Sequence, residues 1–303
     1  MLDELIAEVR NWGRWGPDDE LGTLNLITPE KVVAACRAVR LGRVYPLGVE
    51  LDRKTGPQAT APRRYNPIHF MDELPVDFRF PGDVGVADDV MVLPLQTSTQ
   101  WDSLAHVSYA RQLYNGHPET LVTSHGAQVN SIRSIAGAVT TRGVLVDVAR
   151  FRGVDSLEPG DAVTGADLDA ALAAQGTTVE AGDAVLVRTG FMARSRAVDW
   201  AGYHGDAPGM GIDSVRWLRT RDIAAIATDT ASLEVKPFDV EGVGVPFHAV
   251  ALTQMGMLLG EIFDLDALAE ACAADGVWDF LFVAPPLPVT GGVGSPVNPY
   301  AIR

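Results

Sequence analysis

The second half of the chain alternates β-rich runs with capped helical segments, and this order limits the possible fold more than any other feature. The runs GVLVDVA (143–149) and AVLVRT (184–189) are rich in the β-branched residues that favour strands. Between them, TGADLDAALAAQG (164–176) begins with a Thr suited to an N-cap and ends with a Gly suited to a helix stop. The sequence therefore predicts a strand, a helix and a second strand in succession.

The same alternation continues towards the C-terminus. Helical patterns at SVRWLRTRD, PFHAVALTQM and LDALAEACAADG are interleaved with strand patterns at IAAIATDT, MLLGEIF and WDFLFVAPPL. This order predicts an α/β protein with a mixed central β-sheet and flanking helices. A chain of 303 residues allows one large domain or about two smaller ones. Because no internal repeat or shift in composition marks a boundary, we expect a single domain over residues 1–303.

The first third of the chain predicts one helix and then a long irregular region. The segment ITPEKVVAACRAVRLG (27–42) has Thr28 as N-cap, Pro29 at the first helical position and Gly42 after its end. Residues 53–90 are dense in Pro, Gly and Asp, which indicates long loops leading into the strand-like VMVLPLQ. We likewise expect a loop at about 285–303, where TGGVGSP is typical of turns.

Charge and composition exclude several classes of partner. Lys and Arg total 24 against 39 Asp and Glu, and a net charge of −15 repels nucleic acid. Neither a basic signal-peptide region nor an apolar run of membrane-spanning length occurs, so we expect a cytoplasmic protein that does not bind membranes. Cys36 and Cys272 have no second thiol at ligand spacing, and we expect both to be reduced and buried.

The stretch QWDSLAHV (100–107) contains two groups that can move protons. Asp102 precedes His106 by four positions, and Trp101 lies beside them in an otherwise apolar setting. Gln96 and Gln100 lie just upstream. These residues predict either a reactive site or ordinary packing, and the stretch by itself does not decide between the two.

A second candidate segment is PFHAVALTQMGMLLGEIF, in which His248 and Glu261 are separated by 13 positions. On one straight helix these side chains would lie on different faces. Gly256 is a natural helix stop, however, after which Glu261 on a returning strand can face His248. A carboxylate in the apolar run around Glu261 is costly to bury unless it is paired or bound to a metal. The alternative is an edge-strand residue that faces water.

Other polar and aromatic side chains are weaker candidates. His69, in NPIHFM, could form a pocket wall with the adjacent long loop, whereas His125 and His204 are more typical of surface or hydrogen-bonded histidines. Trp101, Tyr109 and Tyr114 could line a pocket for a flat substrate, and packing in the core explains them equally well. Composition and spacing thus predict an α/β protein with an Asp, Glu and His site.

The stretch QTSTQWDSLAH (96–106) resembles the signature H-x-G-T-H-x-D-x-P-x-H of the putative cyclase superfamily, which includes bacterial kynurenine formamidase and isatin hydrolase. Thr99, Asp102 and His106 occupy signature positions. Gln96 and Gln100 replace the two early histidines, Ser98 replaces the Gly and Leu104 replaces the Pro. FHAVALTQMGMLLGEIFDLDAL is similar to the second family segment, and WGRWGPDDELGTLNLIT and GSPVNPYAI are similar to the opening and closing segments. The resemblance covers nearly the whole chain and implies a kynurenine formamidase-like α/β fold.

In metal-dependent relatives the signature His and Asp residues, with the later His and Glu, bind Zn²⁺ or Mn²⁺, and the last signature His shuttles protons. The resemblance therefore implies metal ligands at Asp102, His248 and Glu261 and a proton shuttle at His106. Gln96 and Gln100 can offer only amide oxygens, which suit Mn²⁺ or Mg²⁺ better than Zn²⁺. We expect at most one divalent ion (Mn, Mg or Zn), weakly held.

Three functions remain open at this level. The first is a hydrolase of a small cyclic or acyclic amide or a lactone, with water activated by a divalent ion or a carboxylate and with His106 as proton shuttle. The second is a metal-independent cyclase, dehydratase or isomerase that uses Asp102, His106 and Glu261 as acid and base. The third is a relative that only binds a metabolite. The resemblance also implies a homodimer or homotetramer.

Overall fold

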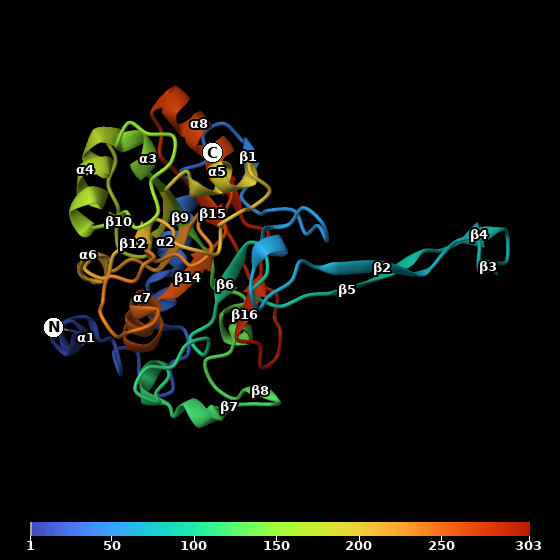
Figure 1. Cartoon of the computed structure of the whole chain (residues 1–303), viewed down its shortest axis with the longest axis horizontal. Helices are drawn as coiled ribbons and strands as arrows, with labels where there is room; N and C mark the ends of the chain where they lie inside the picture. The colour runs from blue at the N-terminus through green and yellow to red at the C-terminus, as the bar shows by residue number, and fades with distance from the viewer. Residues whose placement is uncertain (1) are drawn as a thin grey trace.

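A computed structural model describes residues 2–303 and contains one large mixed β-sheet with helices on both sides (Figure 1). The nine strands lie in the order β1-β17-β15-β9-β11-β13-β14-β6-β16. Their bounds in that order are Val44–Pro46, Tyr300–Ile302, Asp279–Val283, Thr140–Asp147, Ala184–Arg188, Ala225–Thr228, Leu258–Glu261, Gln100–Asp102 and Gly294–Pro296. Strands β9, β11, β13 and β14 are parallel, and the outer strands join antiparallel. The predicted α/β fold with a mixed central sheet is confirmed.

The central strands are apolar because both of their faces are covered. Val144, Val146 and Val187 contribute to one buried cluster, while Leu145 and Leu186 contribute to another. Successive side chains of a strand point to opposite faces, so the two clusters are the cores on the two sides of the sheet. Parallel strands that are buried on both faces have continuous hydrophobic sequences, and these segments have such sequences.

The predicted capping residues Thr28, Thr164 and Gly176 lie at helix ends, but Gly42 does not. Thr164 and Asp167 form a capping box at the start of α4, which ends at left-handed Gly176. The Thr28 side chain accepts a hydrogen bond from the Lys31 amide at the start of α2. That helix ends at Cys36, six residues before Gly42. The α-helices are α1 (Leu2–Val9), α2 (Pro29–Cys36), α3 (Val148–Phe151), α4 (Gly165–Gln175), α5 (Phe191–Arg196), α6 (Ser214–Thr220), α7 (Pro246–Val250) and α8 (Asp266–Asp275).

Shorter elements complete the body of the molecule. The two-stranded pairs are β10 (Ala162–Val163) with β12 (Gly209–Met210) and β7 (Val122–Thr123) with β8 (Gly126–Ala127). One-turn 3₁₀ helices span Gly22–Leu26, Pro57–Thr60, Tyr114–Gly116, Glu119–Leu121 and Ile132–Ile135. Of the two thiols, Cys272 is buried as expected, but Cys36 is exposed. None of the helices within residues 2–303 combines the length and the apolar character needed to cross a membrane.

Two regions predicted as loops contain strands instead. Strand β2 (Ile68–Glu73) pairs with β5 (Asp88–Val92), and β3 (Arg79–Phe80) pairs with β4 (Val84–Gly85), forming an arm that projects from the body (Figure 1). At the C-terminus, β16 and β17 lie in the main sheet. Both regions are rich in Pro and Gly, which obscured strands that are fixed mainly by pairing with distant partners. VMVLPLQ supplies the end of β5 and therefore belongs to the arm.

Candidate functional site

Strands β6 and β14 lie side by side and direct polar side chains to one face of the sheet. Their antiparallel register pairs Asp102 with Leu259 and Gln100 with Glu261. Because side chains alternate along a strand, Gln100, Asp102 and Glu261 share a face, and Trp101 points to the other. Glu261 is thus buried beside a neighbouring strand, and the alternative of a water-facing edge residue is wrong.

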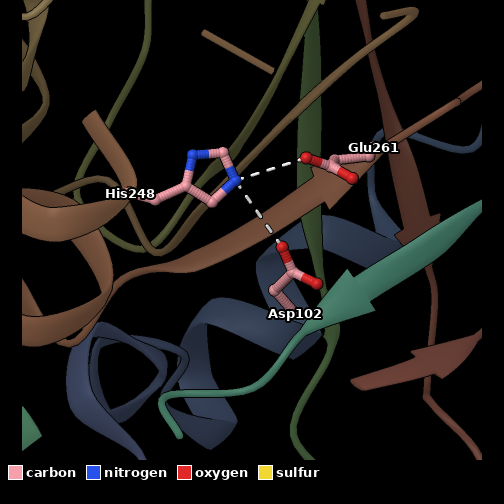
Figure 2. Close-up of side chains that lie close together, drawn as sticks. All are labelled: Asp102, His248 and Glu261. Atoms are coloured by element: carbon pink, nitrogen blue, oxygen red, sulfur yellow. Dashed lines mark hydrogen bonds and ion pairs between the residues drawn. The ribbon is translucent and has the colours of Figure 1, made fainter. Parts of the chain in front are cut away.

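The chain reverses between His248 and Glu261, as the sequence predicts. His248 lies in α7, which continues as a π-helical turn (Ala251–Met255) and ends at Gly256 with φ of 65°. Strand β14 then returns Glu261 towards His248. The His248 Nε2 atom lies 3.2 Å from Glu261 Oε1 and 3.6 Å from Asp102 Oδ2 (Figure 2). Three side chains from separate elements therefore meet at one buried point.

His248 is held from its other side by Glu234. The Nδ1 atom forms a short hydrogen bond with Glu234 Oε1, and the other carboxylate oxygen, Oε2, accepts from the Phe247 amide at 2.8 Å. Burial opposes a charge on this imidazole, but the neighbouring carboxylates of Asp102, Glu234 and Glu261 raise the pKa of His248 well above its ordinary value. Sequence reasoning missed Glu234, although the apolar run that identified Glu261 has a counterpart in ASLEV (231–235).

Asp102 is buried without a hydrogen-bond partner. Neither of its carboxylate oxygens forms a hydrogen bond within the described residues. His106 Nε2 lies 3.8 Å from Oδ1, too long for a hydrogen bond. Burial alone would raise the pKa of Asp102, but His106, His248 and Arg64 bring it below the ordinary value. The carboxylate is therefore charged and has free oxygens available for a ligand.

The two glutamines occupy different surroundings. Gln100 donates from Nε2 to Glu261 Oε2 at 2.7 Å, which leaves its buried Oε1 atom without a partner among the described residues. Gln96 lies against Gly294, where a Cβ atom would come within 2.4 Å of its Nε2. Its backbone carbonyl accepts from Arg64 at 3.1 Å. Gln100 thus contacts the polar cluster directly through Glu261, whereas Gln96 contacts Arg64 and Gly294.

A cavity of about 310 Å³ opens beside the cluster. His106, His248 and Glu261 line it, and Arg64, Lys236 and His204 add nitrogen groups to its wall. The Arg64 Nη1 atom lies 3.9 Å from Glu261 Oε2. Burial lowers the pKa of His204, whose Nε2 lies 2.8 Å from the Pro57 carbonyl. Sequence reasoning missed Arg64 and Lys236 and placed His204 outside the site, because their segments carry no motif.

The proposed aromatic wall is not present at this cavity. Trp101 is fully buried on the opposite face of β6, where it packs on Phe263 and donates from Nε1 to the Ala284 carbonyl at 2.8 Å. Tyr114 is also fully buried and donates to Asp19 at 2.9 Å. Tyr109 packs against the same core cluster as Tyr114. The expectation that these three aromatic rings contact the substrate is therefore corrected. The rings pack in or against the core because their side chains lie on the faces of their segments that point there.

Two further histidines lie away from the cluster. His69 is in strand β2 of the arm, and its Nε2 lies 2.7 Å from Asp89, so the expected pocket wall at His69 is corrected as well. His125 is exposed between β7 and β8, as its isolated position in the sequence suggested.

The donor set of the cluster fits a divalent ion. One ligand atom each from Asp102, His248 and Glu261 lies within 4.8 Å of the others. The free oxygens of Asp102 and the free Oε1 of Gln100 are buried acceptors of the kind that a cation would satisfy. Glu234 fixes the Nδ1 side of His248, an arrangement common behind histidine ligands, and leaves Nε2 directed at the two carboxylates.

Comparisons with known proteins identify the family and the fold of this chain. The family model described as putative cyclase matches residues 45–235. The crystal structure of a novel cyclase is 37% identical, with 98% of this chain and 99% of that chain covered and a TM-score of 0.88. Isatin hydrolase A from Ralstonia solanacearum is 21% identical, with 90% and 97% covered and a TM-score of 0.65. A potential metal-dependent hydrolase with cyclase activity is 15% identical, with 86% and 98% covered and a TM-score of 0.53. None of the curated proteins compared with the chain matches it.

Proposed function

Because the chain belongs to the putative cyclase family, we propose that it is a hydrolase of a small cyclic or acyclic amide or a lactone. The observation that carries this proposal is the buried cluster of Asp102, His248 and Glu261, which borders a cavity together with His106. The structural relatives named as hydrolases support the same class of reaction, although at 21% and 15% identity they share only the fold.

We place one divalent ion at Asp102, His248 and Glu261, with the free amide oxygen of Gln100 as a further donor. Such an ion supplies a Lewis acid and lowers the pKa of a water molecule to near 7. The protein residues prepare the site for it. Glu234 holds the His248 ring, and the amide of Gln100 fixes one oxygen of Glu261.

His106 is the group best placed to move a proton during the reaction. It lines the cavity, its side chain is one-fifth exposed, and its Nε2 faces the charged oxygen of Asp102. As general base it takes a proton from the attacking water, and as general acid it returns that proton to the leaving nitrogen or oxygen. Arg64 and Lys236 place positive charge on the cavity wall. Hydrolysis of an amide or a lactone forms a carboxylate, which these cations can orient.

The proposal is tested by hydrolysis in ¹⁸O-labelled water with a panel of small lactams, imides, acyclic amides and lactones, with and without Mn²⁺. We expect a carboxylate product that contains one labelled oxygen, and we expect loss of turnover in Asp102→Asn. Asp89→Asn, a change of the same kind on the arm, serves as the matched control and should retain turnover. Products without label would contradict hydrolysis.

An unlabelled product would instead support the second candidate, a metal-independent cyclase, dehydratase or isomerase. One observation favours that candidate. His248 Nε2 lies within hydrogen-bond distance of Glu261 and its pKa is raised, so an imidazolium can hold the buried carboxylates together in place of an ion. Asp102, His106 and Glu261 would then act as acid and base. Binding of a panel compound without any conversion would support the third candidate, a metabolite-binding relative.

A further inference from the structure

The cavity of the candidate site is rich in positive charge, although the chain as a whole is acidic. Across the sequence, 39 Asp and Glu residues outnumber 24 Lys and Arg residues. Among the described residues that line the cavity this balance is reversed, with Arg63, Arg64 and Lys236 against the single acid Glu261. Burial and the charges of Lys236 and Arg64 lower the pKa of His204, so this lining imidazole is neutral at pH 7. The wall therefore has more positive charge than its own acid offsets.

Glu261 already has partners of its own. Its Oε2 atom accepts a hydrogen bond from Gln100 at 2.7 Å, and its Oε1 atom lies 3.2 Å from His248 Nε2. Arg64 is the one cation of the wall that approaches it, at 3.9 Å. A divalent ion would offset the carboxylates that bind it, and the wall would then have a larger excess of positive charge. The cations of the wall are therefore available to a ligand.

Lys236 has the fewest partners for a cation that is partly buried. Its backbone forms two hydrogen bonds with Ala207, but its ammonium group forms no ion pair or hydrogen bond within residues 2–303. Lys31, which is also partly buried, pairs with Asp183 at 2.6 Å and with Glu180 at 3.2 Å. A charged group that loses part of its hydration needs a partner in return. At Lys236 a bound anion would be that partner.

Lys236 reaches the cavity from the Glu234 side of His248. Both Glu234 and Lys236 form β-bridges in an extended segment, so their side chains point to the same side of it. Glu234 holds Nδ1 of His248, whereas Nε2 faces Asp102 and Glu261 across the ring. A carbonyl group that reacts near Nε2 and an anionic group at Lys236 therefore belong to two different parts of one ligand.

We infer that the substrate carries a carboxylate of its own, besides the amide or lactone that reacts, and that Lys236 with Arg63 and Arg64 binds it. Ammonium and guanidinium groups form strong charge-assisted hydrogen bonds with carboxylates. The cavity of about 310 Å³ equals roughly ten water molecules at about 30 Å³ each, so the substrate is small. The inference rests on the proposed hydrolase function for the reacting group, but binding of the anion does not require turnover.

The first test measures binding without turnover. The protein, in a buffer that contains Mn²⁺, is titrated in a calorimeter with benzoate and with benzamide, a neutral compound of nearly the same shape. We expect benzoate to bind at least about 10-fold more tightly, since this is the usual worth of a hydrogen bond between charged groups. Lys236→Met should remove most of this preference, and Lys236→Arg should restore it. Lys54→Met, which changes an exposed lysine outside the cavity, is the matched control and should keep the preference.

The second test measures kcat/KM for pairs of compounds that differ by one carboxylate. The pairs are pyroglutamate with 2-pyrrolidinone and N-acetylglycine with N-methylacetamide. We expect a preference of at least about 10-fold for the carboxylate-bearing member, mainly through a lower KM, because the anion is bound equally in the ground state and the transition state. Lys236→Met should lower this preference by the same factor, and Lys54→Met should not change it.

The two tests separate this inference from the proposed function. A preference for benzoate that depends on Lys236, without turnover of any compound, would support the anion site and contradict the hydrolase. Hydrolysis without a preference for the carboxylate-bearing members, together with equal binding of benzoate and benzamide, would overturn the anion site and leave the hydrolase. Tight benzoate binding that Lys236→Met does not weaken would also overturn it, because a carboxylate bound only by a metal ion does not need Lys236.

Discussion

Asp102, with two buried oxygens that lack hydrogen-bond partners, determines what the site can hold. A buried charged carboxylate needs a cation or several hydrogen-bond donors to offset its lost hydration. Imidazoles approach it at 3.6 and 3.8 Å, leaving room for a bound group. The role of each neighbour, His106, His248 or Glu261, depends on which of its side-chain atoms are not already hydrogen-bonded to other residues.

His106 is predicted to move protons without holding the ion. His106→Ala should lower kcat by about 100- to 10,000-fold, the usual scale for a lost general acid or base. The fold and the affinity for Mn²⁺ should be retained. His125→Ala, which changes an exposed histidine, is the matched control. A variant that loses Mn²⁺ binding while it keeps its fold would identify His106 as a ligand.

Glu234 is predicted to position His248. Glu234→Gln keeps the size of the side chain but removes the charge beside Nδ1, so affinity for Mn²⁺ should fall by about 10- to 100-fold. Calorimetric titration measures this change, and Glu241→Gln, on an exposed loop, should bind Mn²⁺ as the unmodified protein does. Equal affinities for all three proteins would show that Glu234 does not support a metal ligand.

The glutamines are predicted to make the site a poor one for Zn²⁺. The unmodified protein should bind at most one exchangeable ion, with Mn²⁺ or Mg²⁺ as acceptable as Zn²⁺, because carboxamides replace nitrogen donors. Gln96→His with Gln100→His should raise Zn²⁺ affinity by several kcal/mol. Since only Gln100 contacts Glu261 directly, Gln100→His alone should give most of this gain. Tight stoichiometric Zn²⁺ binding by the unmodified protein would contradict this prediction.

At the scale of elements, the turn at Gly256 creates the site. It ends the helical segment that carries His248 and starts the chain towards β14 and Glu261. Its φ of 65° suits glycine, and a Cβ atom there would lie 2.4 Å from the Tyr114 ring. The turn at Gly256 therefore requires both a left-handed backbone conformation and a residue without a side chain.

Gly256→Ala should consequently destabilise the protein more than a change in backbone conformation alone can explain. The left-handed conformation costs about 1–2 kcal/mol for an L-residue, and overpacking adds about 1–3 kcal/mol. Gly276 is a matched control, because its φ is 72° but no atom lies within 4 Å of an added Cβ. Chemical denaturation should show a larger loss of unfolding free energy for Gly256→Ala than for Gly276→Ala. Equal losses would mean that Tyr114 moves aside.

At the scale of the whole molecule, buried charge makes stability depend on pH. Burial raises the pKa of Asp229 to about 6, despite hydrogen bonds from Thr189 and the Gly190 amide. The unfolded chain releases this proton near pH 4, so between pH 4 and 6 the folded state binds more protons. The contribution of Asp229 to the free energy of unfolding is therefore largest below pH 4 and is lost as the pH rises through 6.

Comparison with Asp229→Asn isolates this effect from the other carboxylates. The unfolding free energy of the unmodified protein relative to this variant should decrease by about 2 kcal/mol between pH 4 and 6, since each pKa unit is worth about 1.4 kcal/mol and the titration is incomplete at both limits. Both proteins are denatured at the same chain concentration. A difference that does not change with pH would show that the pKa of Asp229 is not raised.

The sequence by itself determined the alternating strands and helices, the caps at Thr28 and Thr164, and the reversal at Gly256. These features are local, because periodicity and capping depend on residues within a few positions of each other. The family-like segments likewise indicated Asp102, His106, His248 and Glu261, whose proximity is now established by the register of β6 with β14 and by the return of the chain after α7.

Only the tertiary structure decided which neighbours these residues have. Glu234 and Arg64 reach the site from segments without a motif, and strand order brings them there. Trp101 is a core residue because its side chain points to the opposite face of β6 from Asp102. The arm formed from a region dense in Pro and Gly because pairing between residues about 20 positions apart stabilises its strands. Burial and long-range pairing depend on which segments meet in space, and no local pattern encodes that.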